Sequence, residues 1–270
     1  MEEKYQRLNE ILREMGSVLV AYSGGVDSTL LLKAAYDVLG DRAVAVTASS
    51  ETYPSSEIKD AERLAREIGV RLISIHTDEL ENEAFVRNAP DRCYHCKTEL
   101  ICKLNEIAAK EGLACVVHGA NADDLNDYRP GSEAAAQLGA RAPLQEAGLT
   151  KAEIREISRE LDLPTWDKPS FACLSSRFPY GTPITPEALA RIDEAEKLLK
   201  SLGFRQVRVR HHGDVARIEV EADELPRLVE PSVRRAIAER FKELGYLYVT
   251  VDIEGYRTGS MNAALQVSNK

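Results

Sequence analysis

The chain has 270 residues, of which 44% are hydrophobic, and a formal net charge of −9. This length allows one large domain or two smaller ones. The acidic balance argues against nucleic acid as the main partner, because duplex binding usually needs a basic face. No apolar run approaches the length of a membrane span. The charged N-terminus and the odd number of cysteines predict a cytoplasmic protein rather than a secreted disulfide framework.

A glycine-rich turn joins the first expected strand, residues 18–22, to the first expected helix, residues 29–39. The turn reads Ser23-Gly24-Gly25-Val26-Asp27-Ser28. A helix N-terminus offers free backbone N–H groups and a positive dipole end, which together bind phosphate. The two glycines allow close approach of the anion, and the two serines add hydroxyl donors. Asp27 is expected to hold a magnesium ion that bridges the phosphates.

This turn resembles the pyrophosphate loop, or PP-loop, of the N-type ATP pyrophosphatases. Those enzymes split ATP into AMP and pyrophosphate, commonly by adenylating a substrate. The turn is not a Walker A loop, since no Gly-Lys-Ser/Thr follows it. The alternative is an ordinary glycine turn between a strand and a helix.

Strand and helix patterns alternate through residues 1–163. Further strands are expected at residues 43–47, 72–75 and 115–119, and further helices at 55–68, 97–110 and 150–161. This order predicts an α/β fold with a doubly wound parallel sheet, whose ligands bind beyond the carboxyl ends of the strands. Gly119, Asn121 and Asp124 follow the fourth strand and are expected to form a second edge of the ATP site. Asp124 is interpreted either as a magnesium ligand or as a helix-capping or solvated loop acid.

Residues 164–185 lose periodicity and are predicted to form a linker that also carries function. Residues 186–270 read as a second, smaller α+β domain, with helices at 186–202 and 233–244 and strands at 206–211, 215–220 and 247–253. Period two places Arg208 and Arg210 on one strand face. That face is either a phosphate site or a solvated surface.

The five cysteines divide into three groups. Cys93 and Cys96 form a Cys-x-x-Cys pair that is compatible with a zinc half-site or with incidental thiols. Cys102 and Cys115 lie in apolar patterns and are expected in the core. Cys173 lies in the polar linker beside Arg177, where it is interpreted as an accessible nucleophile or as a buried linker residue. Cys93, Cys96 and Cys173 together would supply three thiolates for an iron–sulfur cluster with one iron left open.

Motifs spread over almost the whole chain resemble the LarE family of ATP-dependent sulfur transferases, which mature the nickel-pincer cofactor of lactate racemase. They are the loop at 21–28, Asp91–Lys97, His118–Asp124 with Asp127–Gly131, Pro169–Arg177 and Gly255–Asn262. The resemblance implies a PP-loop domain of the adenine nucleotide alpha hydrolase type. It also implies adenylation of a carboxylate of pyridinium-3,5-biscarboxylic acid mononucleotide, followed by displacement of AMP to give a thiocarboxylate.

Members of this family differ in their sulfur source. In one type, the cysteine matching Cys173 gives up its own sulfur and becomes dehydroalanine. In the other, three cysteines hold a 4Fe–4S cluster that carries an extra sulfide, and the presence of Cys93 and Cys96 predicts this type. The resemblance further implies that Ser176, Arg177, Arg208 and Arg210 bind the substrate phosphate. It also implies that the protein forms a homo-oligomer and that a downstream nickel-insertion protein is a possible partner.

Two other enzyme functions and one binding function compete with this reading. A tRNA thiolase or an amidating synthetase could use the same loop, but no RNA-binding module and no glutaminase domain is recognisable. A nucleotide sensor or iron–sulfur scaffold would leave Asp27 and the two strand arginines without a role.

Overall fold

A computed structural model describes residues 1–126, 130–170, 172–257 and 259–260 of the chain. The chain forms two compact units, which are described separately below. The first comprises residues 1–79 and 91–171, and the second comprises residues 80–90 and 172–270. Of the motif residues quoted above, 127–129, 171, 258 and 261–262 lie outside the described part.

The first unit is built on a four-stranded parallel sheet. Its strands are β1 (Val18–Ala21), β2 (Ala43–Ser49), β3 (Arg71–His76) and β4 (Cys115–His118). They lie in the order β3-β2-β1-β4 and every neighbouring pair is parallel. The chain therefore progresses outward from β1 to β3 and then returns to the other side of β1. This reversal between β1 and β4 is the place where open α/β sheets bind their ligands.

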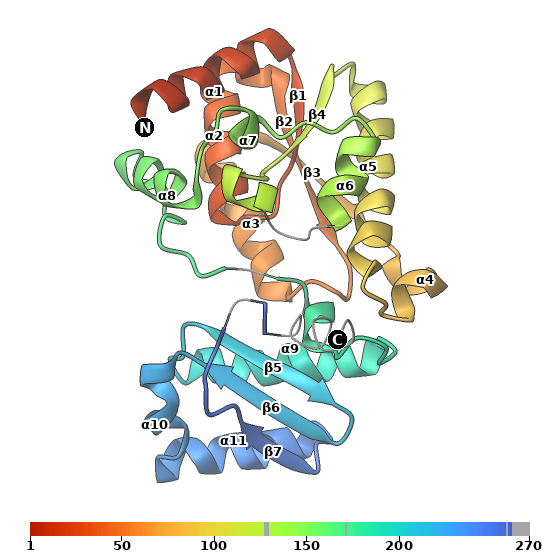
Figure 1. Ribbon diagram of the computed structural model, residues 1–270, viewed down its shortest axis with the longest axis vertical. Helices are drawn as coiled ribbons and strands as arrows, with labels where there is room; N and C mark the ends of the chain where they lie inside the picture. The colour runs from red at the N-terminus through yellow and green to blue at the C-terminus, as the bar shows by residue number, and fades with distance from the viewer. Residues whose placement is uncertain (127–129, 171, 258, 261–270) are drawn as a thin grey trace. The chain divides into compact units, whose positions relative to one another are not determined.

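Helices cover both faces of this sheet (Figure 1). Alternate strand residues face opposite ways, so Val18 and Val20 join one core and Leu19 joins the other. The first core packs against α1 (Glu2–Met15), α2 (Val26–Leu39), α3 (Ser55–Ile68), α7 (Pro143–Glu146) and α8 (Lys151–Glu160). The second packs against α5 (Arg92–Glu111) and α6 (Pro130–Gln137). The predicted doubly wound parallel sheet is thus confirmed.

Local signals in the sequence fix several of these helix ends. Gly69 and Gly112 adopt the left-handed conformation after α3 and α5, as expected for C-terminal caps. Thr150 and Glu153 form a reciprocal capping box at the start of α8. The α5 helix begins at Arg92, earlier than the predicted start at residue 97, so Cys93 and Cys96 lie within the helix. Cys102 is exposed on α5, so its predicted core position is wrong, whereas Cys115 is partly buried against the core.

The second unit contains a small mixed sheet, as the α+β prediction required. The strands are β5 (Val207–His212), β6 (Val215–Val220) and β7 (Tyr248–Val251), with β5 and β6 antiparallel and β6 and β7 parallel. Helices α9 (Pro186–Ser201), α10 (Leu225–Leu228) and α11 (Pro231–Glu243) supply the rest of the core. The short α4 (Glu83–Val86) belongs here too. The Asn88 side chain that follows it donates to the carbonyls of Pro179 and Thr182.

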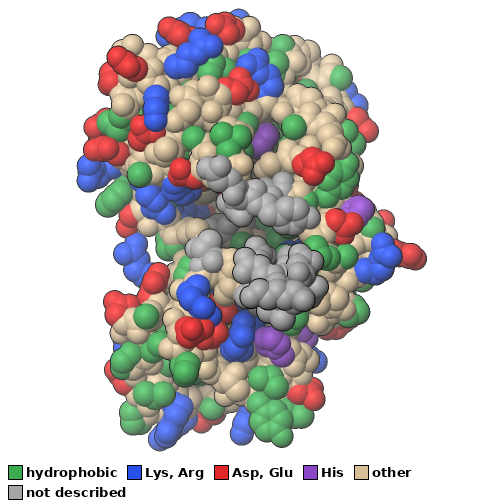
Figure 2. All heavy atoms as spheres, viewed as in Figure 1, with side chains coloured by type: hydrophobic (Ala, Val, Ile, Leu, Met, Phe, Trp, Pro, Cys, Tyr) green, Lys and Arg blue, Asp and Glu red, His purple; other side chains and the backbone are tan. Residues whose placement is uncertain are grey.

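In the described part of the chain, no helix combines the length and apolar character that crossing a membrane requires. On the face of the first unit drawn in Figure 2, acidic and basic side chains are interspersed.

Candidate nucleotide and sulfur-transfer site

The glycine-rich turn lies between β1 and α2, at the carboxyl edge of the sheet. Gly24 has a backbone φ of +68°, which residues other than glycine rarely adopt. A Cβ atom on Gly24 would lie 2.9 Å from Cβ of Ala61 on α3, and one on Gly119 would lie 3.0 Å from the backbone nitrogen of Ser28. A side chain at either position would collide with these neighbouring atoms, so both positions require glycine. Gly119 follows β4, so the two predicted edges of the ATP site do come together at the start of α2.

Polar side chains of the turn are already organised. The hydroxyl oxygens of Ser23 and Ser28 lie 3.1 Å apart, and the Ser28 hydroxyl donates to the Gly25 carbonyl. Gly25 is the N-cap residue of α2, and Val26 begins the helix. This arrangement presents hydroxyl and backbone N–H groups at a helix N-terminus, as an anion site needs.

Asp27 lies at the centre of a polar network within the first unit. Its carboxylate accepts from Nδ2 of Asn121 at 3.2 Å and pairs with Nζ of Lys151 at 2.5 Å. Asp124 accepts from the backbone N–H of Asn121 at 3.0 Å, so it also stabilises the loop after β4. These oxygen donors fit magnesium, which proteins usually hold through one or two carboxylates together with substrate phosphates.

Lys151 was not singled out in the sequence, although a signal was present. It occupies the first position of α8, where its positive charge opposes the helix dipole. A lysine held there against the dipole needs a compensating contact, and Asp27 provides it. The Lys151 backbone N–H also donates to Asp123 at 2.8 Å, which fixes the start of α8 against the loop that follows β4.

His118, the last residue of β4, is buried in this unit with 8% of its surface exposed. Burial, together with the nearby Lys97 ammonium, lowers the pKa of its imidazole to about 4. Burial also lowers the pKa of Lys97 itself, whereas the negative charge of a Cys96 thiolate raises it. The imidazole of His118 is therefore neutral at pH 7.

We predict that His118 makes stability depend on pH. Between pH 6.5 and 4 the unfolded chain binds a proton at this residue and the folded chain does not. Lowering the pH from 7.5 to 5 should therefore cost about 2 kcal/mol of unfolding free energy through His118. Urea unfolding of the native chain and a His118→Gln variant at both pH values measures this. An equal loss of stability in both proteins would contradict the assignment.

The cysteine pair on α5 lies one helical turn apart, so both thiols share a face. Cys93 is exposed, and its sulfur accepts from Arg92 at 3.9 Å. Cys96 is partly buried, and its thiol donates to the buried Glu79 carboxylate at 3.7 Å. Cysteine sulfur is the ligand type that iron–sulfur clusters use, so the pair could supply two such ligands from one helix face.

Cys173 belongs to the second unit, at the N-cap of the short helix η4 (Leu174–Arg177), and is partly buried. Its carbonyl accepts from the hydroxyl of Ser176 and the guanidinium of Arg177 at 2.8 and 2.9 Å. Among the described residues, no three His, Cys, Asp or Glu side chains gather closely enough to hold a metal ion. Joint ligation of a cluster by Cys93, Cys96 and Cys173 therefore stays a prediction.

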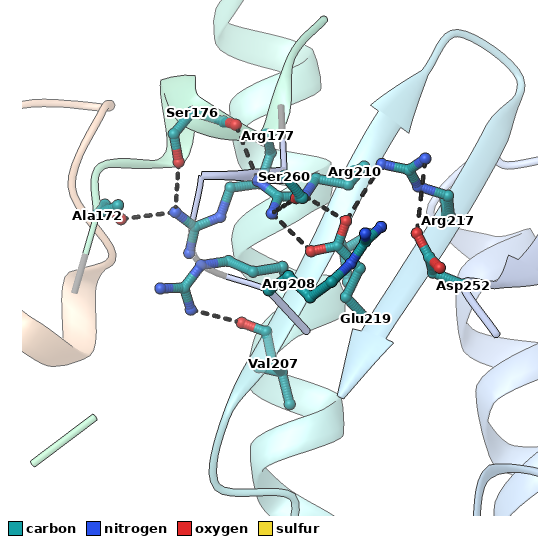
Figure 3. A network of polar contacts seen from close by, with 12 residues as sticks. Ala172, Ser176, Arg177, Val207, Arg208, Arg210, Arg217, Glu219, Asp252 and Ser260 are labelled. Atoms are coloured by element: carbon teal, nitrogen blue, oxygen red, sulfur yellow. Dashed lines mark hydrogen bonds and ion pairs between the residues drawn. The ribbon is translucent and has the colours of Figure 1, made fainter. Parts of the chain in front are cut away.

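The strand arginines lie in a buried charge network in the second unit (Figure 3). Arg208 and Arg210 are 7% and 5% exposed, so the alternative of a solvated strand face is wrong. Arg210 forms a bidentate pair with Glu219 and donates to the carbonyl of Ser176 and the hydroxyl of Ser260. Arg177 pairs in the same way with Glu196.

Arg208 differs from these two in the partners that surround it. Its guanidinium donates to the Val207 carbonyl at 2.7 Å and lies 5.1 Å from the ring centre of Tyr256. Burial and the nearby Arg177 lower the pKa of Arg208 to about 10. Burial and Arg177 therefore destabilise the charged form of Arg208, and binding of an anion would stabilise it.

Fold and loop together define a nucleotide-binding α/β domain of the PP-loop class. The family model for NAD synthase matches residues 1–114. A pyridinium-3,5-bisthiocarboxylic acid mononucleotide synthase from Lactiplantibacillus plantarum is 43% identical over 94% of this chain and 92% of its own length. An uncharacterized protein from Synechocystis sp. is 45% identical over 98% of this chain and 99% of its own. An argininosuccinate synthase from Methanocaldococcus jannaschii is 30% identical over 54% of this chain and 40% of its own.

The chain belongs to the LarE family, that of the pyridinium-3,5-bisthiocarboxylic acid mononucleotide synthases. It is an ATP-dependent enzyme with a PP-loop domain.

Proposed function

We propose that this enzyme adenylates a carboxylate of pyridinium-3,5-biscarboxylic acid mononucleotide and converts it to a thiocarboxylate during nickel-pincer cofactor synthesis. The observation that carries the proposal is the near full-length match to a curated pyridinium-3,5-bisthiocarboxylic acid mononucleotide synthase. The organised anion site at the start of α2 supports it independently, because the first step must stabilise a leaving pyrophosphate.

In the first step, a substrate carboxylate oxygen attacks the α-phosphorus of ATP. The bond from that phosphorus to the bridging oxygen breaks, pyrophosphate leaves, and an acyl adenylate forms. Ser23, Ser28 and the backbone N–H groups of the loop bind the pyrophosphate charge. Asp27 would hold magnesium, which neutralises developing charge when bound. Lys151, paired with Asp27, adds a cation to the same place.

In the second step, a sulfur nucleophile attacks the acyl carbon and the bond to AMP breaks, which leaves a thiocarboxylate. Cys93, Cys96 and Cys173 would hold a 4Fe–4S cluster, which supplies a reloadable sulfide when bound. In the alternative, the Cys173 thiolate attacks, its Cβ–S bond then breaks, and loss of the α-proton leaves dehydroalanine. Arg177 orients Cys173 in either case, because its guanidinium donates to the carbonyls of Ala172 and Cys173.

We assign the phosphate of the substrate mononucleotide to Ser176, Arg177, Arg208 and Arg210. The buried guanidinium of Arg208 is the strongest candidate, since its charge is destabilised by burial and by Arg177. Arg177 and Arg210 keep their carboxylate partners and fix the geometry around it. A phosphate can accept from a guanidinium through two parallel hydrogen bonds, which makes arginine better suited than lysine here.

Product analysis tests the function. Protein prepared without oxygen is incubated with ATP, magnesium and pyridinium-3,5-biscarboxylic acid mononucleotide. The pyridinium products are then separated, and their masses are determined by mass spectrometry. We expect a product in which sulfur replaces one carboxylate oxygen, formed only when ATP is present. An amide product in the presence of ammonia would instead support an amidating synthetase. An unchanged mononucleotide would contradict the proposal.

A further inference from the structure

Lys168 makes contacts that tie the end of the first unit to the pyrophosphate loop. Its Nζ donates to the Gly24 carbonyl at 3.1 Å and pairs with the Glu57 carboxylate at 2.7 Å. The side chains of Lys168 and Glu57 are 19% and 13% exposed. We infer that Lys168 is a positioning residue that holds the Gly24–Gly25 peptide of the loop in its pyrophosphate-binding orientation.

The backbone that carries Lys168 is itself fixed, so the ammonium has a defined place. Arg155 on α8 donates to the carbonyls of Trp166 and Lys168 at 2.7 and 2.8 Å. The Lys168 backbone N–H donates to the Thr165 carbonyl at 3.0 Å. Two hydrogen bonds from one planar guanidinium restrain this short segment more strongly than one flexible contact would.

The peptide between Gly24 and Gly25 is the part of the loop that such a contact can control. In a trans peptide the carbonyl and the following N–H point in opposite directions. A carbonyl held by Lys168 therefore directs the Gly25 N–H away from Lys168 and Glu57. A peptide flanked by two glycines rotates easily, because neither residue has a side chain that restricts it. Lys168 removes this freedom at the residue that caps α2.

Glu57 gives Lys168 a second role. It lies in the first turn of α3, where a carboxylate is favourable to the helix dipole. The same helix approaches the loop closely, since Ala61 would contact a Cβ atom on Gly24. In the absence of Lys168, the Glu57 carboxylate would place a negative charge beside the pyrophosphate site and repel the ligand. It could also accept a hydrogen bond from the Gly25 N–H if the Gly24–Gly25 peptide rotated. The Lys168 ammonium prevents both effects.

The inference rests on ATP binding at this loop and not on the identity of the sulfur acceptor. Calorimetric titration of the full chain with ATP and with AMP, both with magnesium, tests it. Lys168→Met keeps the unbranched stem of the side chain and removes its ammonium group. We expect ATP affinity to fall about tenfold, which corresponds to about 1.4 kcal/mol, while AMP affinity stays unchanged. AMP lacks the two phosphates that the loop binds.

Two further variants make the result specific. Lys59→Met removes an exposed lysine from the same helix as Glu57 and should leave both affinities unchanged. The double variant Lys168→Met with Glu57→Gln should recover part of the ATP affinity, because the negative charge that Lys168 offsets in the native chain is gone. Equal loss of ATP and AMP binding with no recovery would overturn the inference, as would an unchanged ATP affinity. Failure of the native chain to act on the mononucleotide would count against the proposed function alone.

Discussion

Replacement of Cys93 or Cys173 by alanine is expected to remove iron and to abolish repeated sulfur transfer. The native chain, isolated without oxygen, should contain about four irons per chain with matching acid-labile sulfide. Each thiolate that is removed leaves too few protein ligands for a cluster with a single open iron. Iron and sulfide assays, combined with turnover measurements, determine the outcome. Cys102→Ala is the matched control, because Cys102 is an exposed thiol on the same helix as Cys93.

The two variants also separate the two possible sulfur sources. If Cys173 is a sacrificial donor, the native chain should contain no iron and make one product per chain. In that case Cys93→Ala should still complete its single turnover, whereas Cys173→Ala should make no product. Iron in the native chain that survives both substitutions would contradict the proposed ligand set.

Asp27→Asn is expected to slow pyrophosphate release about 100-fold to 1,000-fold, in the range that loss of one strong transition-state contact produces. The amide keeps the shape of the side chain but removes the charge that would hold magnesium and that now pairs with Lys151. Initial rates over a magnesium titration measure the effect. The variant should also require more magnesium for half-maximal rate.

Asp37→Asn provides the comparison for this substitution. Asp37 lies on the same helix as Asp27, but it is exposed and pairs with Lys33 at 2.6 Å. Its replacement should leave the rate within about twofold of the native value, because an exposed pair contributes little. An Asp27→Asn enzyme with native rate and native magnesium dependence would show that Asp27 does not act on the metal.

Much of the first unit could be predicted from the sequence, because its signals are local. Short apolar strand runs, the glycine-rich turn and the capping box at Thr150 each depend on neighbouring residues. The start of α5 was missed although its N-cap residue, Asp91, is of a type that is favoured at helix starts. The Asp91 side chain makes no capping bond in the structure, so residue type alone did not fix how this helix begins.

The polar contacts of the site were less predictable, because they join distant parts of the chain. Lys151 pairs with a residue 124 positions earlier, and Lys168 contacts a carbonyl 144 positions earlier. Period two correctly placed Arg208 and Arg210 on one strand face. It could not show that the face is buried, since that depends on Glu219 across the hairpin. Partners of this kind follow from tertiary packing rather than from spacing.

The dependence of pyrophosphate release on the acceptor tests whether this enzyme adenylates the pyridinium mononucleotide. Native protein is supplied with ATP and magnesium, together with pyridinium-3,5-biscarboxylic acid mononucleotide, nicotinate mononucleotide or total tRNA. We expect release with pyridinium-3,5-biscarboxylic acid mononucleotide and none above background with total tRNA. Release driven by tRNA, or ATP binding without release under any condition, would contradict this expectation.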